Sequence, residues 1–302
     1  MKVISLNEAR KLRFNNLSLA LGTFDGLHVG HMALINAAKS SGGEAAVFTF
    51  DSLPMELFNA DPRPMRLFTL DEKVEALRTA GVDYLCAVHF DKTIAGVRHE
   101  AFIEMICRAF TPKRVIAGYN FTYGWHANGN AETLQEAGQR LGFDVCIVPP
   151  VFVEGEPVSS TRIRECLSAG SIERANKLLG YSYGVSGVVG KGRGIGHRLL
   201  YPTANLVVGK EKLLPRKGVY AVNVESGGKE YRGVCNIGVN PTVSNSGRET
   251  VEVHIIGLER ELYGEELTIR FYRRIRDEIK FSDAQILKEQ IARDIESVAG
   301  ES

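Results

Sequence analysis

Short apolar segments alternate with amphipathic segments along the first half of the chain. The apolar segments predict five strands, over Leu17–Leu21, Ala45–Phe50, Tyr84–Val88, Arg114–Gly118 and Asp144–Val148. Apolar residues at helical spacing predict helices over Met32–Lys39, Leu70–Ala80, His99–Phe110, Ala131–Leu141, from Ser159 or Ser160 to Ala169, and over Ile172–Leu179. Strands that alternate with helices indicate an α/β domain with a doubly wound, mostly parallel sheet.

The pattern changes at about Tyr183, where short β-branched runs begin to alternate with Gly and Pro. Six such runs predict strands over Val185–Val189, Ala204–Val208, Gly218–Glu225, Glu230–Ile237, Thr250–Ile256 and Glu266–Arg274. Consecutive short strands are typical of a small antiparallel β-barrel. A final helix is predicted from Ser282, which can cap it, to Val298. We therefore expect two domains, residues 1–182 and 183–302.

Composition excludes little but narrows the class of partner. Lys and Arg number 37 against 36 Asp and Glu, so the net charge of +1 gives no electrostatic reason to expect nucleic acid or a membrane as the main partner. The sequence holds neither an apolar leader near its start nor a run of 18 apolar residues, and its five scattered cysteines include no C-x-x-C pair. We expect a soluble, unprocessed cytoplasmic protein with reduced thiols and small-molecule substrates; the sequence leaves a homo-oligomer open.

The segment Leu21–His31 joins the first predicted strand to the first predicted helix. Unpaired backbone N–H groups and the helix dipole favour an anion at such a turn. His28 and His31 are three residues apart at the helix start, so both imidazoles can face one phosphate. The alternatives are two surface histidines or a metal site, but no nearby Cys or carboxylate cluster supplies further ligands. The surrounding glycines favour the phosphate interpretation.

Two further segments of the first domain offer groups that suit a nucleotide. Gly118–Gly124 follows a strand and contains Asn120, Phe121 and Tyr123, which can stack a flat ring and bond a hydroxyl or phosphate. The alternative for this segment is an aromatic-rich surface turn. Val158–Arg164 begins a helix and presents hydroxyls and a guanidinium there, a suitable cradle for phosphate oxygens. A simple capping sequence explains the Ser-Ser-Thr equally well.

Two segments of the second domain carry residues suited to ligand binding or catalysis. Gly187–Asn205 contains five glycines, whose N–H groups could wrap phosphates, and ends in Pro-Thr-Ala-Asn. Thr203 and Asn205 face the same side of an extended segment and offer two hard oxygens for Mg²⁺. Glu252 alternates with two valines and faces the opposite side of its strand. A glutamate on an exposed strand face is the ordinary alternative.

The pattern Gly22-x-Phe24-Asp25-Gly26-x-His28-x-Gly30-His31 resembles the first motif of the bacterial bifunctional riboflavin kinase/FAD synthetases. The N-terminal module of that family belongs to the HxGH nucleotidyltransferase superfamily. Gly118–Gly124 is similar to the family's G-x-[ND]-F-x-[FY]-G segment, and Val158–Arg164 is similar to I-S-S-T-x-[IV]-R. The resemblance implies adenylyl transfer from ATP to FMN, with catalytic roles for His28, His31, Ser160, Thr161 and Arg164. It also implies ATP contacts by Gly22, Thr23, Phe24, Asp25 and Gly30, and flavin contacts by Asn120, Phe121 and Tyr123.

The second domain resembles the riboflavin kinases. Gly187–Asn205 is similar to the signature G-x-V-x-x-G…G-x-x-L-G-[FY]-P-T-A-N, and Asn236–Thr242 and Thr250–Ile255 are also kinase-like. The resemblance implies phosphorylation of riboflavin to FMN, with Glu252 as the base and Mg²⁺ held by Thr203 and Asn205. It implies ATP contacts by Gly187, Gly192, Gly196 and Asn236, and a flavin contact by Arg276. ATP is the expected co-substrate of both reactions, and riboflavin, FMN and FAD are the expected substrates and products.

Two segments of the first domain depart from the family pattern, as do His197, Leu200 and Gly257-Leu258 in the second. Phe50–Pro54 keeps only the Phe and the last Pro of F-x-P-H-P, and Trp125-His126-Ala127 stands where the family usually has basic residues. These departures motivate an alternative, a riboflavin kinase whose N-terminal domain has lost or altered adenylyl transfer. A third hypothesis is a flavin-binding or regulatory protein without ATP turnover, against which the intact Glu252, Thr203 and His28 argue. Another HxGH transferase, or a tRNA synthetase fragment, fits the first motif but not the barrel.

Overall fold

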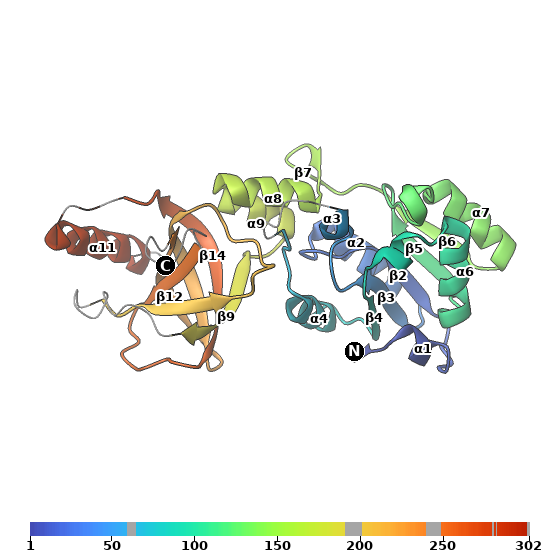
Figure 1. Ribbon diagram of the computed structural model, residues 1–302, viewed down its shortest axis with the longest axis horizontal. Helices are drawn as coiled ribbons and strands as arrows, with labels where there is room; N and C mark the ends of the chain where they lie inside the picture. The colour runs from blue at the N-terminus through green and yellow to red at the C-terminus, as the bar shows by residue number, and fades with distance from the viewer. Residues whose placement is uncertain (59–64, 191–200, 240–248, 280, 282, 301–302) are drawn as a thin grey trace. The chain divides into compact units, whose positions relative to one another are not determined.

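The computed structural model describes residues 1–58, 65–190, 201–239, 249–279, 281 and 283–300 (Figure 1). The chain divides into two compact units, Met1–Ser160 and Thr161–Ser302. This division falls inside the helix α8 (Ser160–Ala169). The functional boundary expected between residues 182 and 183 stays a prediction, and each unit is described by itself.

The first unit is built on a six-stranded parallel sheet. Its strand order is β1 (Lys2–Val3), β4 (Tyr84–Val88), β3 (Ala45–Phe50), β2 (Ser18–Leu21), β5 (Arg114–Gly118) and β6 (Asp144–Val148). All five strands expected in this domain form, with bounds within one residue of the prediction. The sequence did not predict β1, which is short and pairs with β4 through Lys2 and Val3. It also did not predict the two-stranded hairpin of β7 (Phe152–Val153) and β8 (Glu156–Pro157).

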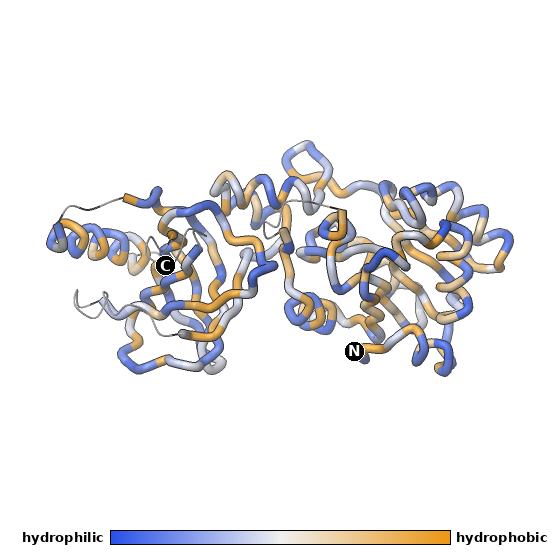
Figure 2. Tube along the Cα trace, in the orientation of Figure 1, coloured by the Kyte–Doolittle hydropathy of each residue, from blue (hydrophilic) through white to orange (hydrophobic). Residues whose placement is uncertain are grey.

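Helices cover both faces of this sheet. One apolar core lies between the sheet and α1 (Leu6–Ala9), α6 (His99–Phe110) and α7 (Ala131–Leu141). The other core lies between the sheet and α2 (Val29–Lys39) and α4 (Leu70–Thr79). Neighbouring residues of a strand serve opposite cores, Leu19 and Leu21 the first and Ala20 the second. Figure 2 colours these strands largely as hydrophobic. The doubly wound sheet predicted from the sequence is confirmed.

The strand order reverses between β2 and β5. From β2 the chain continues outward on one side through β3 and β4, and it then returns to β5 and β6 on the other side. Ligands of open α/β sheets bind beyond the carboxyl ends of the strands at such a reversal. The segments that follow β2 and β5 are Leu21–His31 and Gly118–Gly124, both singled out from the sequence. The topology therefore brings these two segments to the same edge of the sheet.

The second unit contains a closed six-stranded barrel. The strands run in the order β10 (Ala204–Val208), β13 (Glu249–Ile255), β12 (Lys229–Val239), β11 (Gly218–Ser226), β14 (Glu266–Arg276) and β9 (Gly184–Gly190), and all are antiparallel to their neighbours. All six predicted strands form. Alternate residues point inward, so that Val251, Val253 and Ile255 are buried while the residues between them face outward.

Among the described residues of the second unit, most of one helix and the whole of two others accompany the barrel. They are α8, α9 (Ile172–Leu179) and α11 (Ala284–Ala299). Helix α9 ends where the sequence predicts, at Gly180, which has a φ of 84° and so adopts the left-handed conformation that glycine favours. Helix α11 begins later than expected. Its N-cap is Asp283, whose side chain accepts a hydrogen bond from the N–H of Gln285 at 2.6 Å. The expected cap, Ser282, lies outside the described residues.

Candidate active sites

The turn between β2 and α2 is tightly wound. Phe24, Gly26 and Leu27 have φ values of 47°, 77° and 35°, in the left-handed region that non-glycine residues rarely adopt. Phe24 is fully buried in the core beneath α2, which fixes the turn from below. Backbone strain of this kind costs about 1–3 kcal/mol per residue and persists where the surroundings impose it, often at functional sites. Because Phe24 is a core side chain, any ATP contact by this residue would come from its backbone.

The two histidines of the motif lie face to face. His28 is the N-cap of α2, and its Nδ1 accepts a hydrogen bond from the N–H of His31 at 3.2 Å. This bond assigns the proton of a neutral His28 ring to Nε2. The ring centroids of His28 and His31 are 3.7 Å apart, with 15° between the planes. A Cβ atom on Gly30 would lie 3.1 Å from the His28 ring, so a glycine at this position leaves room for the pair. Gly22 leaves similar room for the ring of Phe24.

Buried polar groups support this turn from within the unit. The carboxylate of Asp25 is buried and accepts hydrogen bonds from the N–H groups of Leu67 and Phe68, each at 3.0 Å. The carbonyl of Thr23 accepts from the Thr49 hydroxyl and from Lys73 Nζ, both at 2.9 Å. The structure therefore gives the Asp25 side chain a supporting position inside the protein.

Lys73 is a supporting residue that the sequence analysis missed. It is 4% exposed, and its ammonium also donates to the carbonyl of Phe50 at 2.9 Å and to the Thr49 hydroxyl at 3.4 Å. Burial lowers the pKa of Lys73 to about 8, and the charge of Asp25 opposes this shift. The available signal was a lysine on the apolar stripe of α4, four residues before the buried Leu77.

The helix α8 starts next to the motif. The hydroxyl of Ser160 donates to the carbonyl of Asp25 at 2.9 Å. Ser160 therefore lies beside the turn between β2 and α2, although it is far from that turn in the sequence. Thr161 is exposed in the first turn of α8. Arg164 follows Ser160 by four residues and therefore shares its face of the helix.

The segment after β5 contains both exposed and buried candidates. Asn120 is exposed. Tyr123 is only 6% exposed; its ring is stacked on Phe121 with centroids 5.4 Å apart, and its hydroxyl lies 3.1 Å from that of Thr133. Burial raises the pKa of the Tyr123 phenol. Tyr123 is thus part of the core, and Phe121 packs against that core.

The structure shows the contacts and backbone conformation of the two first-domain segments that depart from the family pattern. The carboxylate of Asp51 lies 3.0 Å from Nδ1 of the exposed His89. Burial acts to raise the pKa of Asp51, but the opposing contributions, led by the hydrogen bonds from His89 and Ser52, together outweigh it, so the pKa is lowered. Trp125 is half exposed, and its ring stands edge-on to that of His126. His126 and Ala127 both have positive φ values, 52° and 55°.

In the barrel, three polar residues form a row across adjacent strands. Asn205 on β10 pairs with Glu252 on β13, and Glu252 pairs with Asn236 on β12. All three are half-buried and alternate with buried residues, so they face outward from the barrel core. Residues directly opposite each other on antiparallel strands have Cβ atoms about 4.5–5.5 Å apart. The structure therefore brings together three residues that are far apart in the sequence.

The remaining candidates of the second unit lie around this row. Thr203 comes directly before β10, is exposed, and follows the alternation that turns Asn205 outward. Gly187 lies on β9, where a Cβ atom would lie 2.5 Å from the carbonyl oxygen of Val207, so the close approach of the two strands explains this glycine. Gly192, Gly196 and residues 240–242 lie outside the described part of the chain.

Arg276 binds another part of its own unit. Its guanidinium donates to both oxygens of Asp294 on α11, at distances of 2.7–3.2 Å, and to the carbonyl of Asp277 at 3.0 Å. Its side chain is 18% exposed and that of Asp294 is 4% exposed. The guanidinium predicted to contact flavin therefore joins β14 to α11.

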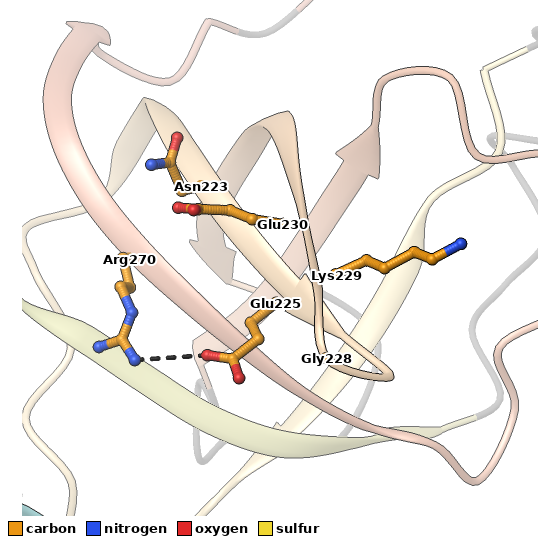
Figure 3. Close-up of a pocket in the computed structure, with 6 residues that line it drawn as sticks. All are labelled: Asn223, Glu225, Gly228, Lys229, Glu230 and Arg270. Carbon is orange, nitrogen blue, oxygen red and sulfur yellow. Dashed lines mark hydrogen bonds and ion pairs between the residues drawn. The ribbon is translucent and has the colours of Figure 1, made fainter.

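A separate hollow of about 210 Å³ opens on the outside of the barrel (Figure 3). It is lined by Asn223, Glu225, Gly228, Lys229, Glu230 and Arg270, none of which the sequence analysis singled out. Arg270 and Glu225 form an ion pair at 3.4 Å. Lys229 points away from the other side chains in Figure 3. This hollow is small and carries charges of both signs.

Within the described ranges, no three His, Cys, Asp or Glu side chains come together in a way that could hold a metal ion. None of the helices in that part of the chain is both long and apolar enough to cross a membrane. The five cysteines all lie in the described part of the chain, and none of them forms a disulfide bond.

Comparison with known families matches both units. Residues 11–162 match the FAD synthetase family, and residues 179–300 match the riboflavin kinase family. Together these matches cover most of the chain. The first contains Leu21–His31 and Gly118–Gly124 and ends within Val158–Arg164, and the second contains the segments described above for the barrel.

Individual relatives agree over nearly the whole length. A bifunctional riboflavin kinase/FMN adenylyltransferase from Listeria monocytogenes is 35% identical over 92% of this chain and 90% of its own. Its namesake from Escherichia coli is 36% identical over 91% of this chain and 90% of its own. A crystal structure from Streptococcus pneumoniae, named as a macrolide-efflux protein, covers 99% of both chains at 30% identity with a TM-score of 0.90. The chain therefore belongs to the family of bifunctional riboflavin kinase/FMN adenylyltransferases.

Proposed function

We propose that this chain makes FAD from riboflavin in two ATP-dependent steps, one in each domain. The observation that carries the proposal is that a single chain holds the paired imidazoles at the sheet edge and the Asn205–Glu252–Asn236 row on the barrel. The first step phosphorylates riboflavin to FMN and releases ADP. The second step joins FMN to the adenylyl group of another ATP and releases pyrophosphate.

In the kinase step, Glu252 accepts the proton of the ribityl 5′-hydroxyl as that oxygen attacks the γ-phosphorus of ATP. Asn236 stands beside Glu252 and contacts ATP, with the backbone of Gly187, Gly192 and Gly196. Thr203 and Asn205 offer a hydroxyl and an amide oxygen, the hard donors that Mg²⁺ prefers, and both lie on the outward face that carries Glu252. Bound there, Mg²⁺ would neutralise charge on the phosphate oxygens.

In the adenylyl-transfer step, a phosphate oxygen of FMN attacks the α-phosphorus of ATP, and the bond to pyrophosphate breaks. His28 and His31 stabilise the negative charge that develops on the α-phosphate. N–H groups in the first turn of α2 favour the same charge. Ser160, Thr161 and Arg164 hold the remaining phosphate oxygens. No residue has to form a covalent intermediate.

The other assignments belong to the same proposal. Gly22, Thr23, Phe24, Asp25 and Gly30 shape the ATP site, and Asn120, Phe121, Tyr123 and Arg276 serve the flavin sites. For Tyr123 and Arg276 the role is support, because the former is buried and the latter is paired with Asp294. We further propose residues 1–182 and 183–302 as the functional domains and the cytoplasm, where thiols stay reduced, as the location.

The test is to incubate the purified protein with ATP, Mg²⁺ and either riboflavin or FMN and to separate the flavins by chromatography. We expect FAD from both starting flavins, with FMN as an intermediate when riboflavin is supplied. FMN from riboflavin without FAD from either flavin would contradict adenylyl transfer and support the kinase-only alternative that the segments Phe50–Pro54 and Trp125–Ala127 motivate. No new flavin in either reaction would contradict both activities.

A further inference from the structure

His254 lies two residues beyond Glu252 on β13 and faces the same side of the barrel. The strand residues on either side of it, Val253 and Ile255, are buried in the barrel core, whereas His254 is half-buried on the outer face. It belongs to none of the groups assigned above to substrate or metal. Because it lies next to the proposed base, its contacts can affect the position of the residues around that base.

The imidazole of His254 is bonded to the segment that leads into β10. Its Nδ1 lies 2.9 Å from the carbonyl oxygen of Pro202. A carbonyl oxygen can only accept, so Nδ1 carries the proton and donates it. The ring of Tyr201 meets the imidazole edge-on, with centroids 5.7 Å apart and 87° between the planes. The orientation of the imidazole is thus set from two sides.

This bond lies at the end of the backbone hydrogen-bond ladder between β10 and β13. Ala204 pairs with Val253 and Asn205 with Glu252, so the same register continued by one residue sets Thr203 opposite His254. Pro202, the residue before, has no N–H to donate. The side chain of His254 therefore adds a cross-strand hydrogen bond to the carbonyl of Pro202, a residue that has no N–H with which to extend the backbone ladder.

We propose that His254 is a positioning residue of the kinase site, which holds the backbone of Pro202 so that Thr203 stays in line with Asn205 and Glu252. This inference rests on the proposed kinase function of that row. His254 itself touches neither substrate nor metal. Its loss should weaken the binding of Mg·ATP more than it slows the transfer step, because Thr203 and Asn205 are the proposed metal ligands.

The test compares His254→Ala, His254→Asn and His254→Gln in the full chain. The amide nitrogen of Asn can take the place of Nδ1, whereas that of Gln reaches toward the position of Nε2. We expect His254→Ala and His254→Gln to raise the KM for Mg·ATP in FMN formation by about tenfold, the lower end of what partners of metal ligands contribute, with a smaller change in kcat. His254→Asn should restore most of the affinity. FAD formation from FMN, the internal control, should not change in any variant.

A double-mutant cycle with Thr203→Val separates positioning from general destabilisation. If His254 acts through Thr203, His254→Ala should add little to the defect of Thr203→Val. Fully multiplicative effects, an unchanged KM in His254→Ala, or a His254→Asn variant as defective as His254→Ala would overturn the inference. Absence of FMN formation by the unaltered protein would instead contradict the kinase proposal itself.

Discussion

Gly30 is the residue at which the geometry of the paired histidines can be tested with the smallest change. Alanine is favoured over glycine inside a helix by about 1 kcal/mol, so Gly30→Ala should leave the stability of the first unit unchanged or slightly higher. Its methyl group would nevertheless press on the His28 ring, 3.1 Å away. A displacement of about 1 Å at a reacting centre can cost about 100-fold in rate.

We therefore expect Gly30→Ala to reduce FAD formation from FMN by about 10- to 100-fold while the thermal unfolding temperature is maintained. Rates of FMN and FAD formation and the unfolding temperature of the same preparation check this prediction. FMN formation from riboflavin is the internal control and should be unaffected. A normal rate of FAD formation would show that the position of the His28 ring does not matter for catalysis.

The lowered pKa of Lys73 predicts that the free energy of unfolding of the first unit changes with pH. Its pKa is about 8 in the folded protein and 10.5 as the ordinary value, so the unfolded chain binds more protons between these two pH values. Stability must therefore rise with pH across this window, and below pH 8 the cost of burying the charged ammonium is fully present. A difference of this size corresponds to about 3 kcal/mol.

The measurement is the free energy of unfolding of the first unit at several pH values between 7.5 and 10.5, for the unaltered protein and for Lys73→Met and Lys73→Arg. Neither replacement titrates in this range, so subtraction of either variant removes the contribution of all other groups. We expect the difference to move in favour of the unaltered protein by about 3 kcal/mol as the pH rises. A flat difference, or one with the opposite sign, would contradict the burial argument.

At the scale of elements, the ion pair of Arg276 with Asp294 holds α11 on the barrel. The pair is nearly buried and bidentate, and Gln290 also donates to Asp294 at 2.8 Å. Removal of one partner of a buried pair leaves an uncompensated charge and typically costs about 3–5 kcal/mol. We expect Asp294→Ala to lower the free energy of unfolding of the second unit by this amount in a denaturant titration.

The matched control is Glu225→Ala in the exposed pair with Arg270, at the hollow in Figure 3. Exposed pairs are worth less than about 1 kcal/mol because water and salt screen them. Equal effects of the two substitutions would show that the Arg276–Asp294 pair is not a tether of α11.

The elements that the sequence predicted well are those with a strong local pattern. The strands beneath both cores and the helices His99–Phe110 and Ala131–Leu141 appear where the apolar periodicity places them. The elements it missed are short. β1 has two residues and forms only because β4 offers an open edge, and α3 (Pro54–Phe58) and α5 (Lys92–Ala95) are single turns. Such elements depend on tertiary contacts, which a local pattern does not contain.

The site was predictable to the extent that its parts are contiguous in sequence. The His28–His31 pair follows from helical spacing and lies together in the structure. Register across three strands brings Asn205, Glu252 and Asn236 into one row, and no local pattern encodes that register. The sequence offered Tyr123 as an aromatic face that could stack a flat ring, and the structure places this side chain in the core, a position that the local pattern does not reveal. The roles of Lys73 and His254 could not be predicted, because each depends on carbonyl groups of residues that are distant in the sequence.

At the scale of the whole molecule, the candidate residues form two sets, one for each proposed reaction. If each set performs one reaction, a substitution in one set should stop one step and leave the other. His28→Ala and Glu252→Gln are the most direct pair of variants, because His28 belongs to the motif at the sheet edge and Glu252 is the centre of the row on the barrel. Each variant serves as the control for the other.

The decisive measurement is therefore the flavin product of these two variants, supplied with ATP, Mg²⁺ and either riboflavin or FMN. We predict that His28→Ala converts riboflavin to FMN and stops there, and that Glu252→Gln converts FMN to FAD but leaves riboflavin unchanged. FAD formation by His28→Ala at the rate of the unaltered protein, or FMN formation from riboflavin by Glu252→Gln at that rate, would contradict the assignment of the two reactions to these two sites.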